Sequence, residues 1–215
     1  MEKSNIDEKI KLLTGSGMWH TQETGDLPSV HLSDGPHGLR KQEEKERQNN
    51  VSLVSTCYPT ASALACSWDV TAAERLGRAV AKEAWNADVA VLLGPGINMK
   101  RSPLCGRNFE YFSEDPFLAG RLGAAYVSAA QGEDVAVSLK HFAANNQETN
   151  RQTSNSQIDE RALREIYLSA FEYVVKTARP ATVMASYNRL NGYYACENRH
   201  LLTEILREEW GFDGV

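Results

Sequence analysis

The sequence predicts an α/β protein in which parallel strands are joined by crossover helices. Short apolar strands alternate with long amphipathic helices, and strands recur with starts near residues 89, 135 and 182. Two architectures fit this rhythm, a (β/α)8 barrel and an open doubly wound sheet. A complete barrel needs eight strands and about 250 residues. The 215 residues here predict four strands and the start of a fifth. On the barrel interpretation the chain is an incomplete (β/α)8 TIM-type barrel with about four to five βα units.

The first third of the chain predicts one short helix, one short strand and a loop. Apolar periodicity indicates a helix over residues 6–13. Residues 29–33 form a short extended run that ends on the turn signal Asp34-Gly35-Pro36. The charged and polar stretch 41–50 is expected to be a solvated loop.

The middle of the chain predicts two helices and two buried strands. A helix over 69–86 begins with an aspartate cap and carries its apolar residues along one face. Residues 88–93 follow as a strand. A second helix, over 115–132, begins with an aspartate cap and a proline at its first position, and ends at a glycine. Residues 135–139 are the next strand.

The last third predicts the most strongly amphipathic helix, a strand and a closing helix. The long helix begins at Asp159, has one apolar stripe, and is followed by Pro180. Residues 181–186 are expected to be a strand and residues 198–210 a helix closed by glycine. Residues 213–215 look like the first residues of another strand.

Composition excludes several classes of protein. The chain has 23 basic and 28 acidic residues, a net charge of −5 and no long basic run, which argues against a nucleic-acid partner. No apolar stretch approaches the roughly 18–20 residues that span a bilayer. The first thirty residues contain no apolar core of a signal peptide, so we expect no membrane partner and a cytoplasmic location.

The cysteines and histidines predict neither disulfides nor a metal site. None of the four cysteines belongs to a C-x-x-C motif, so reduced thiols in the cytoplasm are expected. The five histidines are scattered, without H-E-x-x-H. Walker, G-x-G-x-x-G and G-x-S-x-G motifs are also missing. We therefore expect no metal and no organic cofactor.

Polar side chains gather where the predicted strands end. In parallel α/β folds these carboxyl ends meet at one edge, which is where ligands bind. Six residues are thereby predicted to line one pocket: Asp34, Arg107, Lys140, His141, Arg151 and Tyr187.

Each of these residues also has a structural alternative. Asp34 could be a turn former, Arg107 could pair with Glu110 on a loop surface, and Tyr187 could fill the core. The joint clustering at strand ends favours function. A carboxylate, several cationic and neutral donors, and an aromatic ring together suit the vicinal hydroxyls of a sugar.

Five ordered segments resemble the N-terminal part of glycoside hydrolase family 3 β-glucosidases, along almost the whole chain. They are SDGPHGLR at 33–40, GPGIN at 94–98, GRNFEYFSEDP at 106–116, KHFAANNQE at 140–148 followed by Arg151, and VMASYN at 183–188 followed by Asn191-Gly192. The resemblance implies a glucoside pocket in which Asp34 binds the distal hydroxyls. Arg107, Lys140, His141 and Arg151 would hold the other ring hydroxyls, and Tyr187 would lie near the anomeric centre.

The resemblance implies a retaining mechanism whose two carboxylates lie outside this sequence. The nucleophile belongs to a V-x-S-D-W type segment on the strand that follows residues 211–214, about four residues beyond Val215 by the family's spacing. The acid/base glutamate is expected from a second, α/β-sandwich domain. Residues 1–215 are then the N-terminal portion of the barrel domain, inactive alone, and neither Glu110 nor Glu148 is assigned a catalytic role.

Three alternatives stay open from the sequence. The same family includes β-xylosidases and α-L-arabinofuranosidases, and a few contacts set pentose specificity. A non-catalytic sugar-binding module would use the same pocket without the nucleophile. An unrelated enzyme on a doubly wound sheet would need a glycine-rich phosphate turn, which the sequence lacks. Residues 143–146 stand where the hexosaminidase branch carries P-G-H-G, which disfavours N-acetylglucosaminides. Aglycone, linkage and oligomeric state are not predicted.

Overall fold

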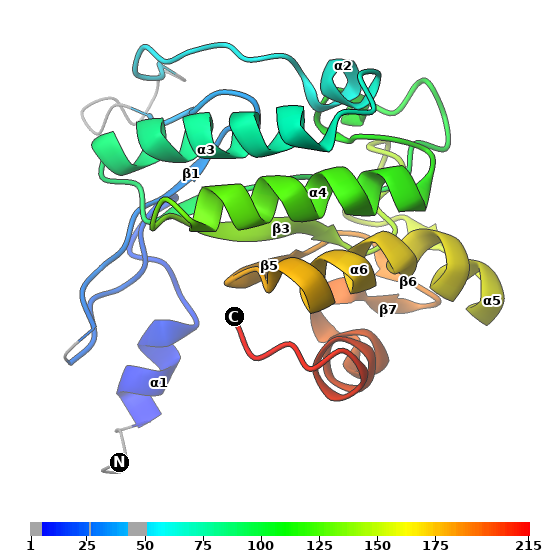
Figure 1. The fold of residues 1–215 in the computed structure, drawn as a ribbon. Coiled ribbons are helices and arrows are strands. Elements are labelled where there is room, and N and C mark those ends of the chain that lie inside the picture. The colour runs from blue at the N-terminus through cyan, green and yellow to red at the C-terminus, as the bar shows by residue number, and fades with distance from the viewer. Residues whose placement is uncertain (1–5, 26, 43–50) are drawn as a thin grey trace.

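The computed structural model describes residues 6–25, 27–42 and 51–215 (Figure 1). The predicted alternation of strands and helices is confirmed. One parallel sheet contains four strands in the order β1-β2-β3-β5, namely β1 (Leu32–Asp34), β2 (Val91–Leu93), β3 (Ala136–Phe142) and β5 (Thr182–Ala185).

Long helices connect these strands. They are α3 (Val70–Asn86), α4 (Pro116–Gln131), the continuous run α5 (Glu160–Ala162), η2 (Leu163–Leu168) and α6 (Ser169–Ala178), and η4 (His200–Glu209). The aspartate caps act as predicted: the Asp69 carboxylate accepts from the backbone N–H of Thr71, and that of Asp115 accepts from Phe117. The remaining short elements are α1 (Ile6–Leu12), α2 (Ala61–Ala65), η1 (Asn108–Glu110), β4 (Asn155–Ser156), β6 (Arg189–Leu190), β7 (Tyr193–Tyr194) and η3 (Ala195–Glu197).

The order of the strands favours the barrel over the doubly wound sheet. Strand order follows chain order without the reversal that marks a doubly wound sheet. Helices α3, α4 and α6 pack side by side and lie in front of the strands in Figure 1. In addition, the N–H of Val215 donates to the Ala181 carbonyl (3.1 Å) and that of Val183 donates to the Val215 carbonyl (2.8 Å). These two bonds are a parallel pairing that places Val215 beside β5, where the sequence predicts the first residues of another strand.

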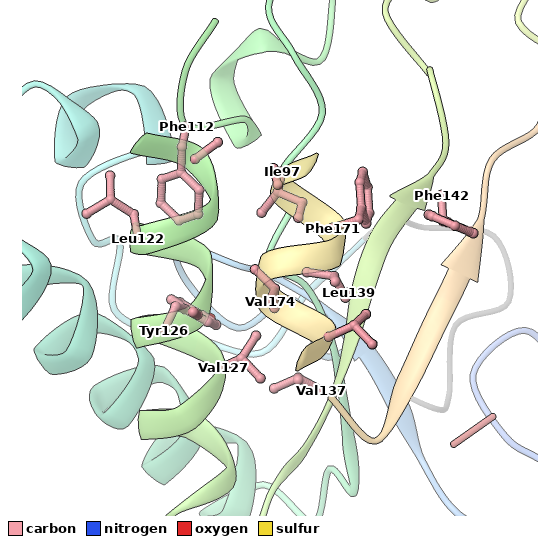
Figure 2. Packing of buried hydrophobic residues seen from close by; sticks show 14 of the residues in the cluster. Ile97, Phe112, Leu122, Tyr126, Val127, Val137, Leu139, Phe142, Phe171 and Val174 are labelled. Carbon is pink, nitrogen blue, oxygen red and sulfur yellow. The ribbon is translucent and has the colours of Figure 1, made fainter. Parts of the chain in front are cut away.

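The core lies between the sheet and the helix layer. Figure 2 shows Val137 and Leu139 of β3 facing side chains of α4 and α6, among them Val127 and Val174. At the end of β3, the ring of Phe142 meets the rings of Phe171 and Trp210 edge to face, at 5.2 and 5.7 Å. Burial of this layer holds the carboxyl ends of the strands in place.

Several boundaries differ from the predicted ones. β3 extends to Phe142, so Lys140 and His141 lie within the strand and not after it. The register shifts between Lys140 and Phe142, where the Lys140–His141 peptide bond is cis. β2 begins only at Val91, because Asp88 has a φ of +53° and belongs to a turn. The run η2 and the closing helix η4 are wound as π-helices.

A second, small sheet was not predicted. Its three strands β4, β6 and β7 have two residues each, too few for any apolar periodicity to appear. Of the predicted loop 41–50, residues 43–50 lie outside the described residues, and Gln42 bridges to Ser52. None of the described helices combines the length and the apolar character needed to cross a membrane.

Candidate functional site

A cavity of about 350 Å³ lies where β1 and β3 end. Such a volume is typical of small-molecule pockets. Its walls come from the turn after β1, from the segment that precedes α2 and from the loop after β2. The side chains that line it include Asp34, His37, Arg107, Phe109, Glu110 and Lys140.

The turn after β1 places Asp34 at the cavity. Gly35 has a φ of +123°, a conformation that favours glycine, and a Cβ there would lie 2.1 Å from the Gly38 carbonyl oxygen. The N–H of Arg40 donates to the Asp34 carbonyl (2.8 Å), which closes the turn. The sequence Asp34-Gly35-Pro36-His37-Gly38 therefore folds back tightly and holds the carboxylate of Asp34 on the cavity wall.

Four charged side chains that line the cavity form one cluster. The ammonium group of Lys140 lies 3.1 Å from the Glu110 carboxylate and 3.5 Å from that of Asp34. The guanidinium of Arg107 pairs with the other oxygen of Glu110. The side chains of Lys140 and Glu110 are only 2% and 4% exposed. Removing such charges from water is costly, so each one depends on its partner.

Glu110 also affects the titration of Arg107. Burial alone would lower the pKa of the guanidinium, but the charge of Glu110 and the hydrogen bond to it hold the pKa above its usual value. Arg107 therefore stays a cation, and its ion pair with Glu110 holds the guanidinium in place beside the cavity.

The backbone of His141 is held by the side chain of Asn98. The amide nitrogen of Asn98 donates to the His141 carbonyl (2.8 Å), and its amide oxygen accepts from the His141 N–H (2.7 Å). Beside these two hydrogen bonds, the Ile97 N–H donates to the Lys140 carbonyl (2.9 Å). The loop after β2 thus pairs with the end of β3 and fixes both Lys140 and His141.

The side chain of His141 belongs to a chain of hydrogen bonds whose members do not line the cavity. Its Nδ1 lies 2.9 Å from the hydroxyl of Tyr111, which accepts from the amide of Asn145 (2.9 Å). The same amide donates to Glu148 (3.0 Å), and Arg151 donates to the other oxygen of Glu148 (2.8 Å).

Arg151 in turn stacks on Tyr187. The guanidinium carbon of Arg151 lies 4.8 Å from the centre of the Tyr187 ring, within the range of a cation–π contact. Tyr187 is half exposed, so it is not core filler.

Gly96 makes room for the ring of Tyr111, and we expect that Gly96→Ala destabilises the protein. A Cβ at this position would lie 2.8 Å from the ring of Tyr111, closer than real contacts allow. Overpacking of this kind costs about 1–3 kcal/mol. Urea unfolding of the complete polypeptide measures the loss. Gly17→Ala is the matched control, because its added methyl would meet nothing within 4 Å. Equal effects of the two variants would contradict the packing argument.

Burial lowers the pKa of His141 far below its usual 6.5, and the charges of Arg107, Lys140 and Arg151 act in the same direction. The unfolded chain then binds a proton more readily than the folded one. The stabilisation by neutral His141 is complete above pH 6.5 and falls as the pH drops below it.

We expect His141→Gln to remove this part of the pH dependence. Between pH 7.5 and pH 5, the free energy of unfolding should fall by about 2 kcal/mol more in the wild-type protein than in the variant. Urea unfolding at both pH values measures this difference. Carboxylates that titrate in the same range contribute equally to both proteins. An identical pH dependence in the two would show that His141 does not titrate as its burial requires.

Of the six residues predicted to line one pocket, three line this cavity, namely Asp34, Arg107 and Lys140. His141 and Arg151 belong to the hydrogen-bonded chain, and Tyr187 stacks on Arg151. The alternative pairing of Arg107 with Glu110 does occur, but in a buried cluster and not on a loop surface.

The predicted site leaves out several residues of the cavity and of the hydrogen-bonded chain, among them Glu110, Tyr111, Asn145, Glu148 and His37. His37 lines the cavity and packs its ring against Phe109. The signal for Glu110 was its position three residues after Arg107, within reach for a short-range ion pair. In the part of the chain that the structure describes, no group of three or more metal-ligating side chains could hold an ion.

Comparison with known proteins gives a consistent result. Residues 36–215 match the family model described as glycosyl hydrolase family 3 N terminal domain. The chain is 52% identical to thermostable beta-glucosidase B of Acetivibrio thermocellus, over all of this chain and 29% of that protein. It is 49% identical to an exo-alpha-(1->6)-L-arabinopyranosidase of Bifidobacterium longum, over 98% of this chain and 28% of that protein.

Among solved structures, the beta-glucosidase from Kluyveromyces marxianus in complex with glucose matches with a TM-score of 0.93 and 43% identity. The match covers 99% of this chain and 25% of that one. The chain therefore spans less than a third of the length of the curated relatives that it matches.

Proposed function

The chain belongs to glycosyl hydrolase family 3, and from this premise we propose that it supplies the sugar-binding part of a retaining β-glucosidase. The complete polypeptide would release β-D-glucose from the non-reducing ends of β-glucosides. Residues 1–215 would form the first part of its (β/α)8 barrel. The rest of the barrel and a second, α/β-sandwich domain would follow in the complete polypeptide.

The charged cavity at the ends of β1 and β3 is the observation that supports this proposal most. It combines a partly exposed carboxylate, Asp34, with the buried ammonium group of Lys140 and the partly buried guanidinium of Arg107. Ionised acceptors and donors of this kind make strong hydrogen bonds to hydroxyl groups. We assign Asp34 to the distal hydroxyls of glucose and the two cations to the other ring hydroxyls. His141 and Arg151 would complete the set, with Tyr187 near the anomeric centre.

The two reacting carboxyl groups are assigned to the complete polypeptide beyond residue 215. Retention requires them about 5–5.5 Å apart across the scissile bond, one as nucleophile and one as acid/base. Glu110 and Glu148 are poor candidates, because each carboxylate is already held by a neighbouring cation. The reaction requires two carboxyl groups and water, and we propose no cofactor.

A second candidate activity is α-L-arabinopyranoside hydrolysis. It is supported by the 49% identity to the Bifidobacterium longum exo-alpha-(1->6)-L-arabinopyranosidase. An α-L-arabinopyranoside lacks the hydroxymethyl group of glucose and has the opposite configuration at C4, so contacts with these two positions would decide between the two sugars. β-Xylosides and α-L-arabinofuranosides are tested in the same assay.

Hydrolysis of aryl glycosides by the complete polypeptide tests these proposals. We expect the highest kcat/KM on the β-D-glucoside, with the β-anomer of glucose as the first product seen by proton NMR. The 215-residue chain, assayed alongside, should show no turnover. Glucose binding without hydrolysis of any glycoside would indicate a sugar-binding module, and preference for the α-L-arabinopyranoside would select the second candidate.

We also propose a cytoplasmic location. The thiols of Cys57, Cys66, Cys105 and Cys196 are all free, which supports a reducing compartment. Cell fractionation with an antibody against the protein tests it, since recovery outside the cytoplasmic fraction would contradict it.

A further inference from the structure

We propose that Tyr111, Asn145 and Glu148 are positioning residues that hold His141 as the tautomer with its proton on Nε2. His141 would then only donate a hydrogen bond to a sugar oxygen and never accept one. This inference rests on the proposed function, because it assigns a direction to one contact within the same site. It assigns a role to a hydrogen-bonded chain that carries no direct contact with the cavity.

The hydroxyl of Tyr111 fixes the direction of the first hydrogen bond. Tyr111 is fully buried, and among the described residues its hydroxyl contacts only Nδ1 of His141 and the amide of Asn145. The amide group donates, so the hydroxyl oxygen accepts from it. The hydroxyl hydrogen then has Nδ1 of His141 as its one available acceptor. If Nδ1 were protonated instead, this hydrogen would be buried without a partner, which is costly.

Glu148 fixes the orientation of the Asn145 amide. An ionised carboxylate only accepts hydrogen bonds, so the amide nitrogen and not the amide oxygen must face it. The guanidinium of Arg151 holds the other carboxylate oxygen at 2.8 Å. The direction of every bond in the chain therefore follows from one ion pair, which lies at the end farthest from His141.

The surroundings of His141 exclude its doubly protonated form as well. The imidazole is 2% exposed, and the cations Lys140, Arg107 and Arg151 all disfavour a further positive charge there. Asn98 fixes the backbone of His141 through two hydrogen bonds. Among the described residues Nε2 has no hydrogen-bond partner. Nε2–H is thus a donor held in place for a ligand.

This arrangement has a consequence for specificity. A donor of fixed direction contributes to binding only when the sugar presents an oxygen at that position. A sugar that lacks that one oxygen should therefore bind more weakly to the wild-type protein. This loss of affinity should be smaller when Tyr111 is replaced. Other sugar hydroxyls bind to other residues, so their contributions should not depend on Tyr111.

Neutron crystallography of the complete wild-type polypeptide tests the tautomer without any assay of activity. We expect deuterium on Nε2 of His141 and none on Nδ1, with the Tyr111 deuterium directed at Nδ1. Deuterium on Nδ1 would overturn the proposal. Because this measurement needs no substrate, it decides the proposal even if the polypeptide hydrolyses no glycoside.

Kinetics with the 2-, 3-, 4- and 6-deoxy analogues of an aryl β-glucoside test the role of the chain. The penalty for an analogue is the factor by which its kcat/KM falls below that of the parent glucoside. In Tyr111→Phe we expect this penalty to shrink by about tenfold for one analogue and to stay as in wild type for the other three. Glu148→Gln should shrink the same penalty by a smaller factor. A loss that is uniform over all four analogues would indicate a merely structural role and would overturn the proposal.

Tyr126→Phe is the matched control for these kinetics. Tyr126 is also fully buried, on α4, but its hydroxyl makes no hydrogen bond among the described residues. Its removal should leave all four penalties unchanged. If Tyr126→Phe changed the same penalty as Tyr111→Phe, loss of any buried hydroxyl would explain the effect, and the proposal would fail.

Discussion

Replacement of Glu110 by alanine is expected to lower the free energy of unfolding by about 3–5 kcal/mol, because it leaves buried cations without their counter-ion. Lys140 would keep only the longer contact to Asp34, at 3.5 Å, and Arg107 would lose its carboxylate partner. Glu110→Gln should destabilise less, since its amide oxygen can still accept one of the two hydrogen bonds. Urea unfolding of the complete polypeptide measures both changes.

Glu165→Ala is the matched control for this prediction. Glu165 pairs with Arg161 on the helix surface, where the two side chains are 61% and 84% exposed. Surface pairs of this kind contribute less than about 1 kcal/mol. If Glu110→Ala and Glu165→Ala destabilised the protein equally, the buried charges would not depend on one another as we argue.

Replacement of Asp34 by alanine in the complete polypeptide is expected to lower kcat/KM for an aryl β-glucoside by at least about 100-fold. Charge-assisted bonds to sugar hydroxyls strengthen towards the transition state, so their loss lowers the rate as well as the affinity. Asp34 is also a partner of Lys140, but Glu110 lies nearer to that ammonium group and would keep it paired. The fold should therefore survive the substitution.

The control for Asp34→Ala is Asp115, an aspartate that does not line the cavity. Asp115→Ala removes the N-cap of α4, which should cost about 1 kcal/mol of stability and change kcat/KM less than about threefold. An effect of Asp34→Ala as small as this one, with the fold intact, would make Asp34 a turn former and would remove it from the sugar site.

The long elements could be predicted from the sequence because their signals are local. Helices α3 and α4 have aspartate caps and long apolar faces, and both were predicted within one or two residues of their ends. The extent of β3 could not be predicted in this way. Its last residues are held by the loop after β2, where Gly96 bridges to Lys140, and no local pattern reports a partner 44 positions away.

In the candidate site, too, residues marked by a local signal could be predicted, and contacts between distant segments could not. Strand ends mark Asp34, Lys140 and His141 because their positions follow from the alternation of elements. The spacing of Glu110 from Arg107 predicts their ion pair, but it does not predict that Glu110 is buried at the site. Its burial depends also on Lys140, which comes from the distant strand β3. The π-wound turns of η2 and η4 likewise leave no mark in apolar periodicity.

The strand order β1-β2-β3-β5 also has a consequence for how the site is made during synthesis. Strands β2, β3 and β5 each pair with the preceding strand of this sheet, so a growing chain can add strands one at a time as they leave the ribosome. Asp34 and Lys140 are 106 residues apart. At about 5–20 residues per second, roughly 5–20 s pass between the synthesis of the two. Throughout that interval Asp34 lacks the Lys140 cation, as does Glu110 once it has been synthesised, so the charge cluster can form only after β3 has emerged.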